Sequence, residues 1–239
     1  MNRFIPARRF DERILEMMDD PNADATLLRD ELKNLRRINK FFGGLSAIRE
    51  SVFELAQELP VTNPVRILDL GTGSADLPIH LVECAANAHR EFHVTAVENN
   101  PIVFDVARER TRQFPAITVE RGNILSLAYP PQSFDIVLCS LTLHHFSHQQ
   151  ITRIIASMND LSRIGIIIND LRRSWPAAWT AKLYSLLTTR NPMTIYDGYL
   201  SVLRGFTREE LRRLAHAAGV HKFEIRTRPL FRLLLLGMR

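Results

Sequence analysis

The 239-residue chain has few cysteines and few lysines, and it has no long apolar run. Its two cysteines, Cys84 and Cys139, lie in apolar surroundings without metal-ligand spacing, which excludes a disulfide framework and a thiolate zinc site. The apolar residues 233–236 are far too few to span a bilayer. The first nine residues also lack a long apolar run, so we expect no signal peptide. These absences predict a cytoplasmic protein with reduced thiols.

Acidic side chains are fewer than basic ones. There are 31 Lys and Arg against 26 Asp and Glu, a formal net charge of +5. The excess is mostly arginine after residue 160, and it is dispersed, with no known nucleic-acid-binding module. We interpret it as a solvated basic surface, with attraction for an acidic or carrier-bound substrate as the alternative, and we do not expect a nucleic-acid partner. The oligomeric state stays open, with a homodimer among the options.

The remainder of the chain is organised around a glycine turn. The apolar run 65–70 breaks at Gly71 and Gly73, and helical spacing resumes at Leu77. This pattern predicts a strand, a tight turn and a helix, with backbone that a ligand can approach closely. Asp76 occupies the position of the third glycine of a dinucleotide-binding loop. Because a carboxylate is unfavourable beside phosphates, Asp76 and the strand-terminal Asp69 favour a ligand with positive charge.

Segments whose apolar residues repeat with the period of a strand alternate with segments whose apolar residues repeat with the period of a helix. This alternation predicts a parallel sheet covered by helices on both faces. An antiparallel strand pair at the C-terminus follows a helix that starts with the capping box Thr207 and Glu210. The N-terminal residues 11–59 are predicted to be helical, starting at 11–18. The predicted strands cover residues 66–70, 92–97, 117–120, 134–139, 164–168, 223–228 and 231–236.

Several polar residues follow these strands, at the sheet edge where open α/β sheets bind ligands. Glu98 ends the second strand about 25 residues after the glycine turn, where a carboxylate can bond both hydroxyls of a ribose. His144 and His145 follow the fourth strand, and imidazole is a base near neutral pH. We favour His145 slightly, with structural histidines as the alternative. Asp170, after the fifth strand, is either a substrate or acid–base residue or, as we favour, the partner of Arg172 or Arg173.

The stretch 65–78 resembles motif I of the class I S-adenosylmethionine-dependent methyltransferases. Residues 71–78 and 140–146 are most similar to ubiquinone/menaquinone-type enzymes. The front segment, 18–44, is similar to methyltransferases associated with bacterial type III polyketide synthases. The resemblance implies a Rossmann-like, doubly wound, mostly parallel seven-stranded sheet with an antiparallel C-terminal strand. It also implies a helical cap at 1–60 and a methyltransferase domain at 61–239 with an insertion at about 175–205. Ala75 departs from the family pattern, which often has glycine there.

The resemblance further implies S-adenosylmethionine as cofactor. We expect no metal, since the sequence shows no metal-ligand spacing. The resemblance places adenine at Asn123 and Ile124, which follow the third strand. The insertion carries aromatic residues that predict one wall of a substrate pocket, although core packing explains them equally well. The cofactor set is Asp69, Gly71, Gly73, Asp76, Glu98, Asn99, Asn123, Ile124 and Ser140. The catalytic set is His144 and His145, and the substrate set is Asp170 and Tyr196.

The predicted reaction is methyl transfer to a phenolic or enolic oxygen of a small aromatic, polyketide-like or lipid-like acceptor. The sulfonium activates the methyl group, so the protein aligns the nucleophile and removes its proton. Alternatives are a nucleic-acid or protein methyltransferase, a non-catalytic cofactor-binding partner and an NAD-dependent oxidoreductase. The last is disfavoured by Asp76.

Overall fold

The computed structural model describes residues 4–20, 22–41 and 44–239. In this part of the chain, one seven-stranded sheet has the order β3-β2-β1-β4-β5-β7-β6. The first five strands are parallel, and β7 runs antiparallel to both β5 and β6. This arrangement confirms the predicted fold class. The strands are β1 (Val65–Leu70), β2 (Phe92–Glu98), β3 (Ile117–Arg121), β4 (Phe134–Ser140), β5 (Ser162–Leu171), β6 (Phe223–Arg228) and β7 (Arg232–Met238).

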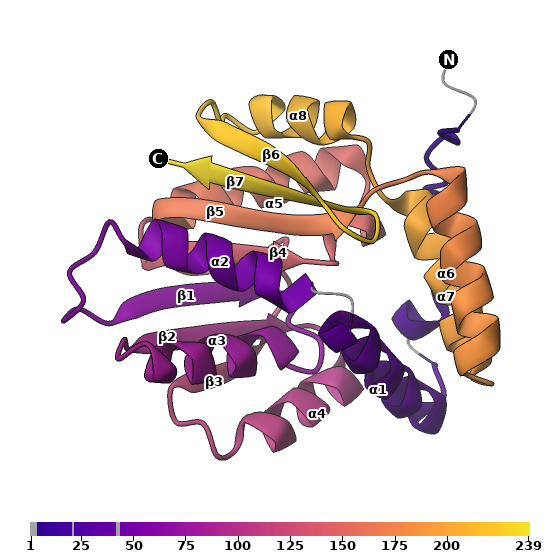
Figure 1. Ribbon diagram of the computed structural model, residues 1–239, viewed down its shortest axis with the longest axis horizontal. Coiled ribbons are helices and arrows are strands. Elements are labelled where there is room, and N and C mark those ends of the chain that lie inside the picture. Colours follow the sequence, from indigo (N-terminus) through magenta and orange to yellow (C-terminus); the bar gives the residue numbers. More distant parts are fainter. Residues whose placement is uncertain (1–3, 21, 42–43) are drawn as a thin grey trace.

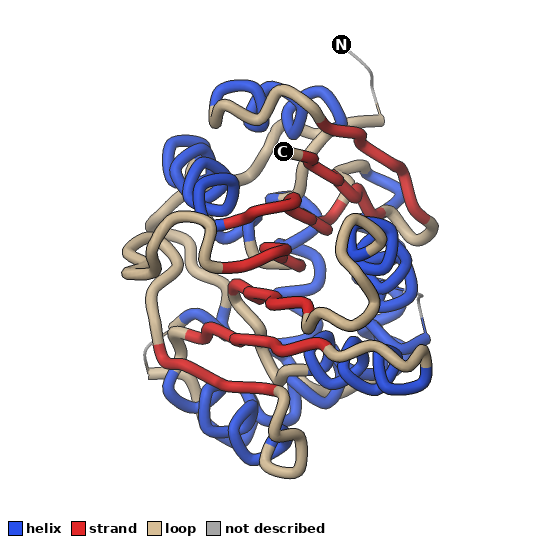
Figure 2. Tube along the Cα trace, turned by 90° about the vertical axis from the view of Figure 1, so that its left-hand side faces the viewer, coloured by secondary structure: helices blue, strands red, loops and turns tan. Residues whose placement is uncertain are grey.

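The central strand β1 is buried on both faces. Val65 and Ile67 belong to one hydrophobic cluster, while Leu68 and Leu70 belong to the other. Successive side chains of a strand point to opposite faces, so an almost continuous apolar run requires cover on both sides. Figure 2 shows helices on both sides of the sheet. Helices α2 and α3 cover one face, and α5 and α8 cover the other.

Most predicted helices are present, and side-chain caps mark several of their starts. Asn100 caps α4, and the capping boxes at Ser147 and Thr207 start α5 and α8, the second as predicted. None of the helices in the described part of the chain combines the length and apolarity needed to cross a membrane. The α-helices are α1 (Ala25–Phe41), α2 (Gly44–Ala56), α3 (Asp76–Asn87), α4 (Pro101–Thr111), α5 (His148–Leu161), α6 (Trp175–Thr188), α7 (Pro192–Arg204) and α8 (Arg208–Ala217).

The helix predicted to start at residues 11–18 is wrong. This segment is irregular up to the short 3-10 helix η1 (Met17–Asp19). The Asp11 side chain accepts the backbone N–H of Arg13, and Asp197 on α7 accepts the backbone N–H groups of Met17 and Met18. Bonds to side chains therefore replace the intrahelical ones. We call residues 4–20 the N-terminal strap.

Helices α1, α6 and α7 gather at the end of the sheet where the parallel strands finish, which we call the carboxyl edge (Figure 1). Asn191, whose side chain accepts the Met193 N–H, separates α6 from α7 and caps α7. Helix α2 belongs to the predicted cap, yet it packs on the sheet through β5 and β7. Phe42 and Gly43, within the segment predicted to be helical, lie outside the described residues. The domain division at residue 60 stays a prediction.

Candidate active site

The glycine turn between β1 and α3 is built from left-handed backbone. Gly71, Gly73 and Ala75 have φ of 70°, 58° and 59°. A Cβ at Gly71 would lie 2.5 Å from the Thr142 side chain, so glycine lets the loop after β4 pack against the turn. A Cβ at Gly73 would have no atom within 4 Å, so space is open beside its backbone. The two glycines thus serve different purposes, one for packing and one for access.

Glu98 connects the glycine turn to the start of α4. Its Oε2 accepts the Gly73 N–H at 3.0 Å, and its Oε1 accepts the N–H groups of Asn99 and Asn100, both at 2.9 Å. Burial raises the pKa of Glu98, and these backbone donors oppose the increase. The carboxylate is therefore held by three backbone donors beside the open face of Gly73.

The two aspartates of the turn are in different environments. Asp69 is 2% exposed and accepts the Thr72 hydroxyl at 2.7 Å. Its burial raises the pKa to about 7. Asp76 pairs with Arg110 at 2.5 Å, so its charge is already balanced within the chain. The sequence pattern gave no sign of this partner, which comes from α4.

The remaining predicted cofactor residues lie around the same edge. Ser140 accepts the Asn169 amide at 3.0 Å, and Asn99 is exposed. Asn123 is exposed, and its side chain accepts the Leu125 N–H at 2.9 Å, a typical turn contact. Ile124 is 6% exposed and belongs to the same core cluster as Leu70 and Val97.

His144 and Asp170 form a buried pair. Nδ1 of His144, on the short helix η2 (Leu143–His145), lies 2.7 Å from Oδ1 of Asp170. Although burial raises the pKa of Asp170, the charge and hydrogen bond of His144 bring it below its ordinary value. The favoured pairing of Asp170 with Arg172 or Arg173 is wrong. Strand β5 continues to Leu171, so Asp170 lies within the sheet and its side chain faces the loop after β4.

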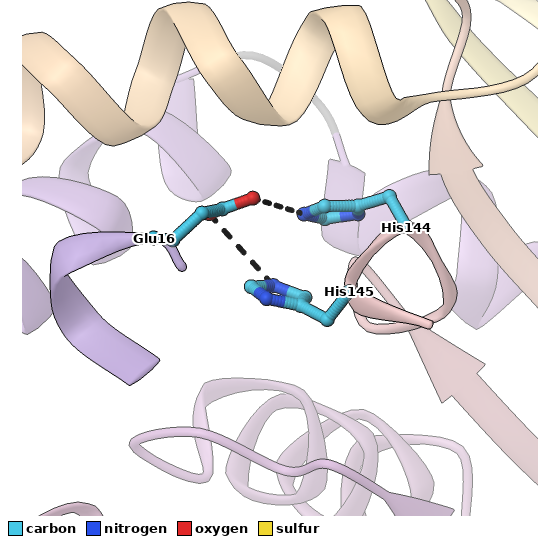
Figure 3. Close-up of side chains that lie close together, drawn as sticks. All are labelled: Glu16, His144 and His145. Carbon is cyan, nitrogen blue, oxygen red and sulfur yellow. Dashed lines mark ion pairs between the residues drawn. The ribbon is translucent and has the colours of Figure 1, made fainter. Parts of the chain in front are cut away.

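His145 contacts the N-terminal strap. Its Nδ1 lies 2.6 Å from Oδ2 of Asp19, although the two residues are 126 positions apart in the sequence. Burial lowers the pKa of His145, but the carboxylates of Glu16 and Asp19 outweigh it and raise the pKa to about 9. Figure 3 shows both histidines with the Glu16 carboxylate beside them. Their Nε2 atoms lie 3.9 and 4.0 Å from its oxygens, beyond hydrogen-bond length.

The sequence analysis missed Glu16 and its partners. Glu16 is 1% exposed, accepts the Ser201 hydroxyl at 2.6 Å and pairs with Arg204 at 3.3 Å. A glutamate within an otherwise apolar stretch, between Leu15 and Met17, was the only local signal. The atoms of Glu16, His144 and His145 that could ligate a metal lie within 4.8 Å of one another, a spacing that also admits a cation. The pairings with Asp170, Asp19 and Arg204 account for the cluster without one, and the absence of a metal stays a prediction.

Tyr196, the other predicted substrate residue, is 45% exposed on α7. Trp179 on α6 is 58% exposed and lies near Tyr199, with ring centroids 6.0 Å apart. The aromatic side chains of the insertion are thus divided between the α6–α7 contact and the surface. Their role toward a substrate stays a prediction.

Comparison with known proteins identifies the central part of the chain. Residues 67–165 match the family model described as a methyltransferase domain. Together with the fold, this match identifies residues 67–165 as a class I S-adenosylmethionine-dependent methyltransferase domain. The matched methyltransferase domain covers the glycine turn, Glu98 and the histidine pair, so all three lie in the part of the chain that the family shares.

A curated relative agrees with the assignment of this domain. Over 94 residues the chain is 33% identical to a demethylmenaquinone methyltransferase of Deinococcus radiodurans, a match that covers 38% of this chain and 37% of the relative. The chain thus spans little more than a third of that relative's length.

Solved structures share the fold. A SAM-dependent methyltransferase from Aquifex aeolicus has 14% identity and a TM-score of 0.61, covering 90% of this chain and 98% of the other. Magnesium protoporphyrin IX methyltransferase from Synechocystis, with bound SAH, has 15% identity and a TM-score of 0.60, covering 90% and 100%. At such low identity the likeness establishes the fold alone.

Proposed function

We propose that this chain transfers the methyl group of S-adenosylmethionine to a phenolic or enolic oxygen of a small aromatic, polyketide-like or lipid-like acceptor. The observation that carries the proposal is the buried His144–Asp170 pair at the carboxyl edge, in the loop that packs on the glycine turn. Thr142 of that loop donates its hydroxyl to the Gly71 carbonyl at 3.3 Å. A base and a cofactor-binding turn are therefore built against each other.

The residues of the carboxyl edge fit this cofactor. Open space beside the Gly73 backbone, next to the Glu98 carboxylate, suits a ribose with two hydroxyl donors. Asp69 supplies negative charge at the end of β1 for the cationic methionine part, while Asn123 and Ile124 are assigned to adenine and Asn99 and Ser140 border the site. When bound, the cofactor supplies a methyl group already activated by positive sulfur.

The chain's own chemistry is alignment and proton removal. With Nδ1–H of His144 bonded to Asp170, its Nε2 carries the lone pair that accepts the hydroxyl proton of the acceptor. Asp170 then stabilises the imidazolium ion. We assign the base to His144 rather than His145, because Asp170 orients His144 from within the sheet, whereas the partner of His145 is on the strap.

Names of relatives support a small-molecule acceptor. The curated relative acts on a demethylmenaquinone and one structural neighbour on a magnesium porphyrin, both of which are small, conjugated molecules. In the described part of the chain we found no feature that favours a nucleic-acid or protein acceptor. A non-catalytic partner would keep the cofactor residues, so product formation separates that alternative.

The first test is thermal unfolding with S-adenosylhomocysteine, S-adenosylmethionine and NAD in parallel. A ligand at 100 times its Kd stabilises the native state by about 2.7 kcal/mol, and we expect this from the two S-adenosyl ligands alone. Methylation of phenolic acceptors is then measured by mass spectrometry. A shift with NAD alone, or binding without methylation of any acceptor class, contradicts the proposal.

A further inference from the structure

Helix α6 exposes a row of large apolar side chains. Trp179, Leu183, Leu186 and Leu187 are 58%, 59%, 53% and 77% exposed. Their spacing of four, three and one residues places them on one side of a helix. Other positions, such as Ala177, Ala178 and Ser185, are buried against the rest of the chain. Apolar side chains this large and this close together on a surface mark an interaction site.

The charged side chains of the segment that carries this row are all positive. From residue 171 to residue 196 the sequence contains no Asp or Glu, whereas it contains Lys182, Arg190 and the exposed Arg172. The Lys182 ammonium lies 5.5 Å from the Trp179 ring centroid and 5.3 Å from that of Tyr199. A partner that covers the apolar row therefore meets positive charge and aromatic rings together.

Two occupants are disfavoured on physical grounds. Helix α6 has 14 residues, and it lacks the length and apolarity needed to cross a bilayer. A second copy of the chain, docked by a two-fold axis through α6 near Lys182, would bring the Lys182 ammonium groups of the two copies together. Repulsion between like charges opposes that contact.

We propose that α6 binds the surface of a membrane that contains anionic lipids. The apolar row enters the boundary between headgroups and acyl chains, and Lys182, Arg172 and Arg190 interact with anionic headgroups. Trp179 and Tyr199 are residue types that favour this interface because their rings combine apolar and polar character. The helix lies in the plane of the membrane and does not span it.

The position of α6 connects this surface to the carboxyl edge. Helices α6 and α7 pack together at that end of the sheet, and α7 contacts η1 and η2, which carry the site (Figure 1). Membrane binding thus brings the edge close to lipid, where a lipophilic acceptor is concentrated. This last consequence rests on the proposed function, but membrane binding itself does not.

The test is sedimentation of the full chain with vesicles of phosphatidylcholine and with vesicles of equimolar phosphatidylcholine and phosphatidylglycerol. We expect binding to the anionic vesicles that weakens as salt rises. The double variant Leu183→Ser/Leu187→Ser should weaken this binding about tenfold or more, because it removes apolar surface from the interface. Lys182→Glu should do the same by reversing a charge.

Matched controls are Val61→Ser and Lys222→Glu, which change an exposed apolar residue and an exposed lysine far from α6 in sequence. Both should bind like the unmodified chain. Thermal unfolding and the S-adenosylhomocysteine shift, measured on every variant, separate loss of membrane binding from loss of fold or of the cofactor site. Equal binding of the α6 variants and the controls overturns the proposal. The proposal is also overturned if the unmodified chain does not bind vesicles but forms dimers, and the α6 variants abolish those dimers.

Discussion

Neighbouring groups hold both the imidazole ring and the backbone of His144. Asp170 bonds its Nδ1, and the ring of His145 stacks at 4.3 Å between centroids. Arg8 donates to the His144 and Phe146 carbonyls at 3.3 and 2.9 Å, which holds the backbone of the loop. A side chain held in this way loses little freedom when substrate binds, which favours a catalytic role.

Replacing His144 tests that role. We expect His144→Ala to lower turnover by about 10²- to 10⁴-fold, because proton removal by a positioned base is lost. Binding of S-adenosylhomocysteine, followed by thermal shift, should persist. Asp170→Asn should lower turnover in the same direction while it keeps the buried volume. His93→Ala, which removes an exposed histidine paired with Glu91, is the control. Unchanged turnover in both site variants would remove the base assignment.

Ala75 is a buried alanine in left-handed backbone, 0% exposed with φ of 59°. Ala75→Gly relieves backbone strain of roughly 1–2 kcal/mol. It also costs a similar amount of stability, because a buried methyl group is removed and the unfolded chain gains conformational entropy. We expect a change in unfolding free energy within about 0.5 kcal/mol, measured in urea. Ala85→Gly is the matched control, since Ala85 is equally buried but lies in helix α3. There we expect a loss of about 2 kcal/mol, and equal losses at both sites would show that Ala75 is unstrained.

At the level of elements, buried carboxyl groups join the strap and α1 to α7. The Thr194 hydroxyl donates to Glu31 on α1, and Asp197 accepts the Met17 and Met18 N–H groups at 2.7 and 3.0 Å. Burial raises the pKa of Glu31 to about 7 and that of Asp197 to about 7. These contacts are therefore sensitive to proton concentration near neutral pH.

The pH dependence follows from the sign of these shifts. Between the ordinary carboxyl range and pH 7, the folded chain binds more protons at Glu31 and Asp197 than the unfolded chain, so stability falls as pH rises through this window. Glu31→Gln should stabilise the chain by about 1–3 kcal/mol at pH 8 and much less at pH 5, measured by urea unfolding. The exposed Glu83→Gln should change stability by under about 0.5 kcal/mol at both pH values. A Glu31→Gln gain that is the same at pH 5 and pH 8 contradicts the assignment.

On the scale of the whole molecule, stability is concentrated in the sheet. Strands β1, β4 and β5 lie in the middle of the strand order and contribute to both core clusters. Among the strap residues only Pro6 and Glu16 are buried, and its links to other elements include polar ones such as those of Glu16 with Arg204 and of Asp197 with Met17. Regions with few buried contacts open without global unfolding.

Hydrogen exchange measures this difference. Amides of β1 and β4 should exchange only through global unfolding, with free energies that fall steeply in denaturant. The Met17 and Met18 amides should exchange through local opening, with lower free energies and little denaturant dependence. Equal free energies with equal denaturant slopes in strap and sheet would show instead that the strap belongs to the global cooperative unit.

Local pattern was sufficient for the sheet and the glycine turn. The apolar run of β1, Gly71 with its φ of 70°, and Glu98 at the end of β2 depend on residues close in sequence, and the prediction placed them correctly. Caps such as Thr207 were equally visible, since a cap bonds residues two or three positions away. The parallel direction of β1 to β5 followed from the rule that strands alternating with helices form a parallel sheet.

The sequence by itself determined the fold class and the glycine turn that follows β1, because periodicity and turn chemistry act over a few residues. Only the tertiary structure decided that residues 11–16 are irregular, that Asp170 pairs with His144, and that Asp19 meets His145 across 126 positions. Such pairings are fixed by which elements pack together. Burial then makes an unpaired charge costly, so each carboxylate takes the partner that packing brings within reach.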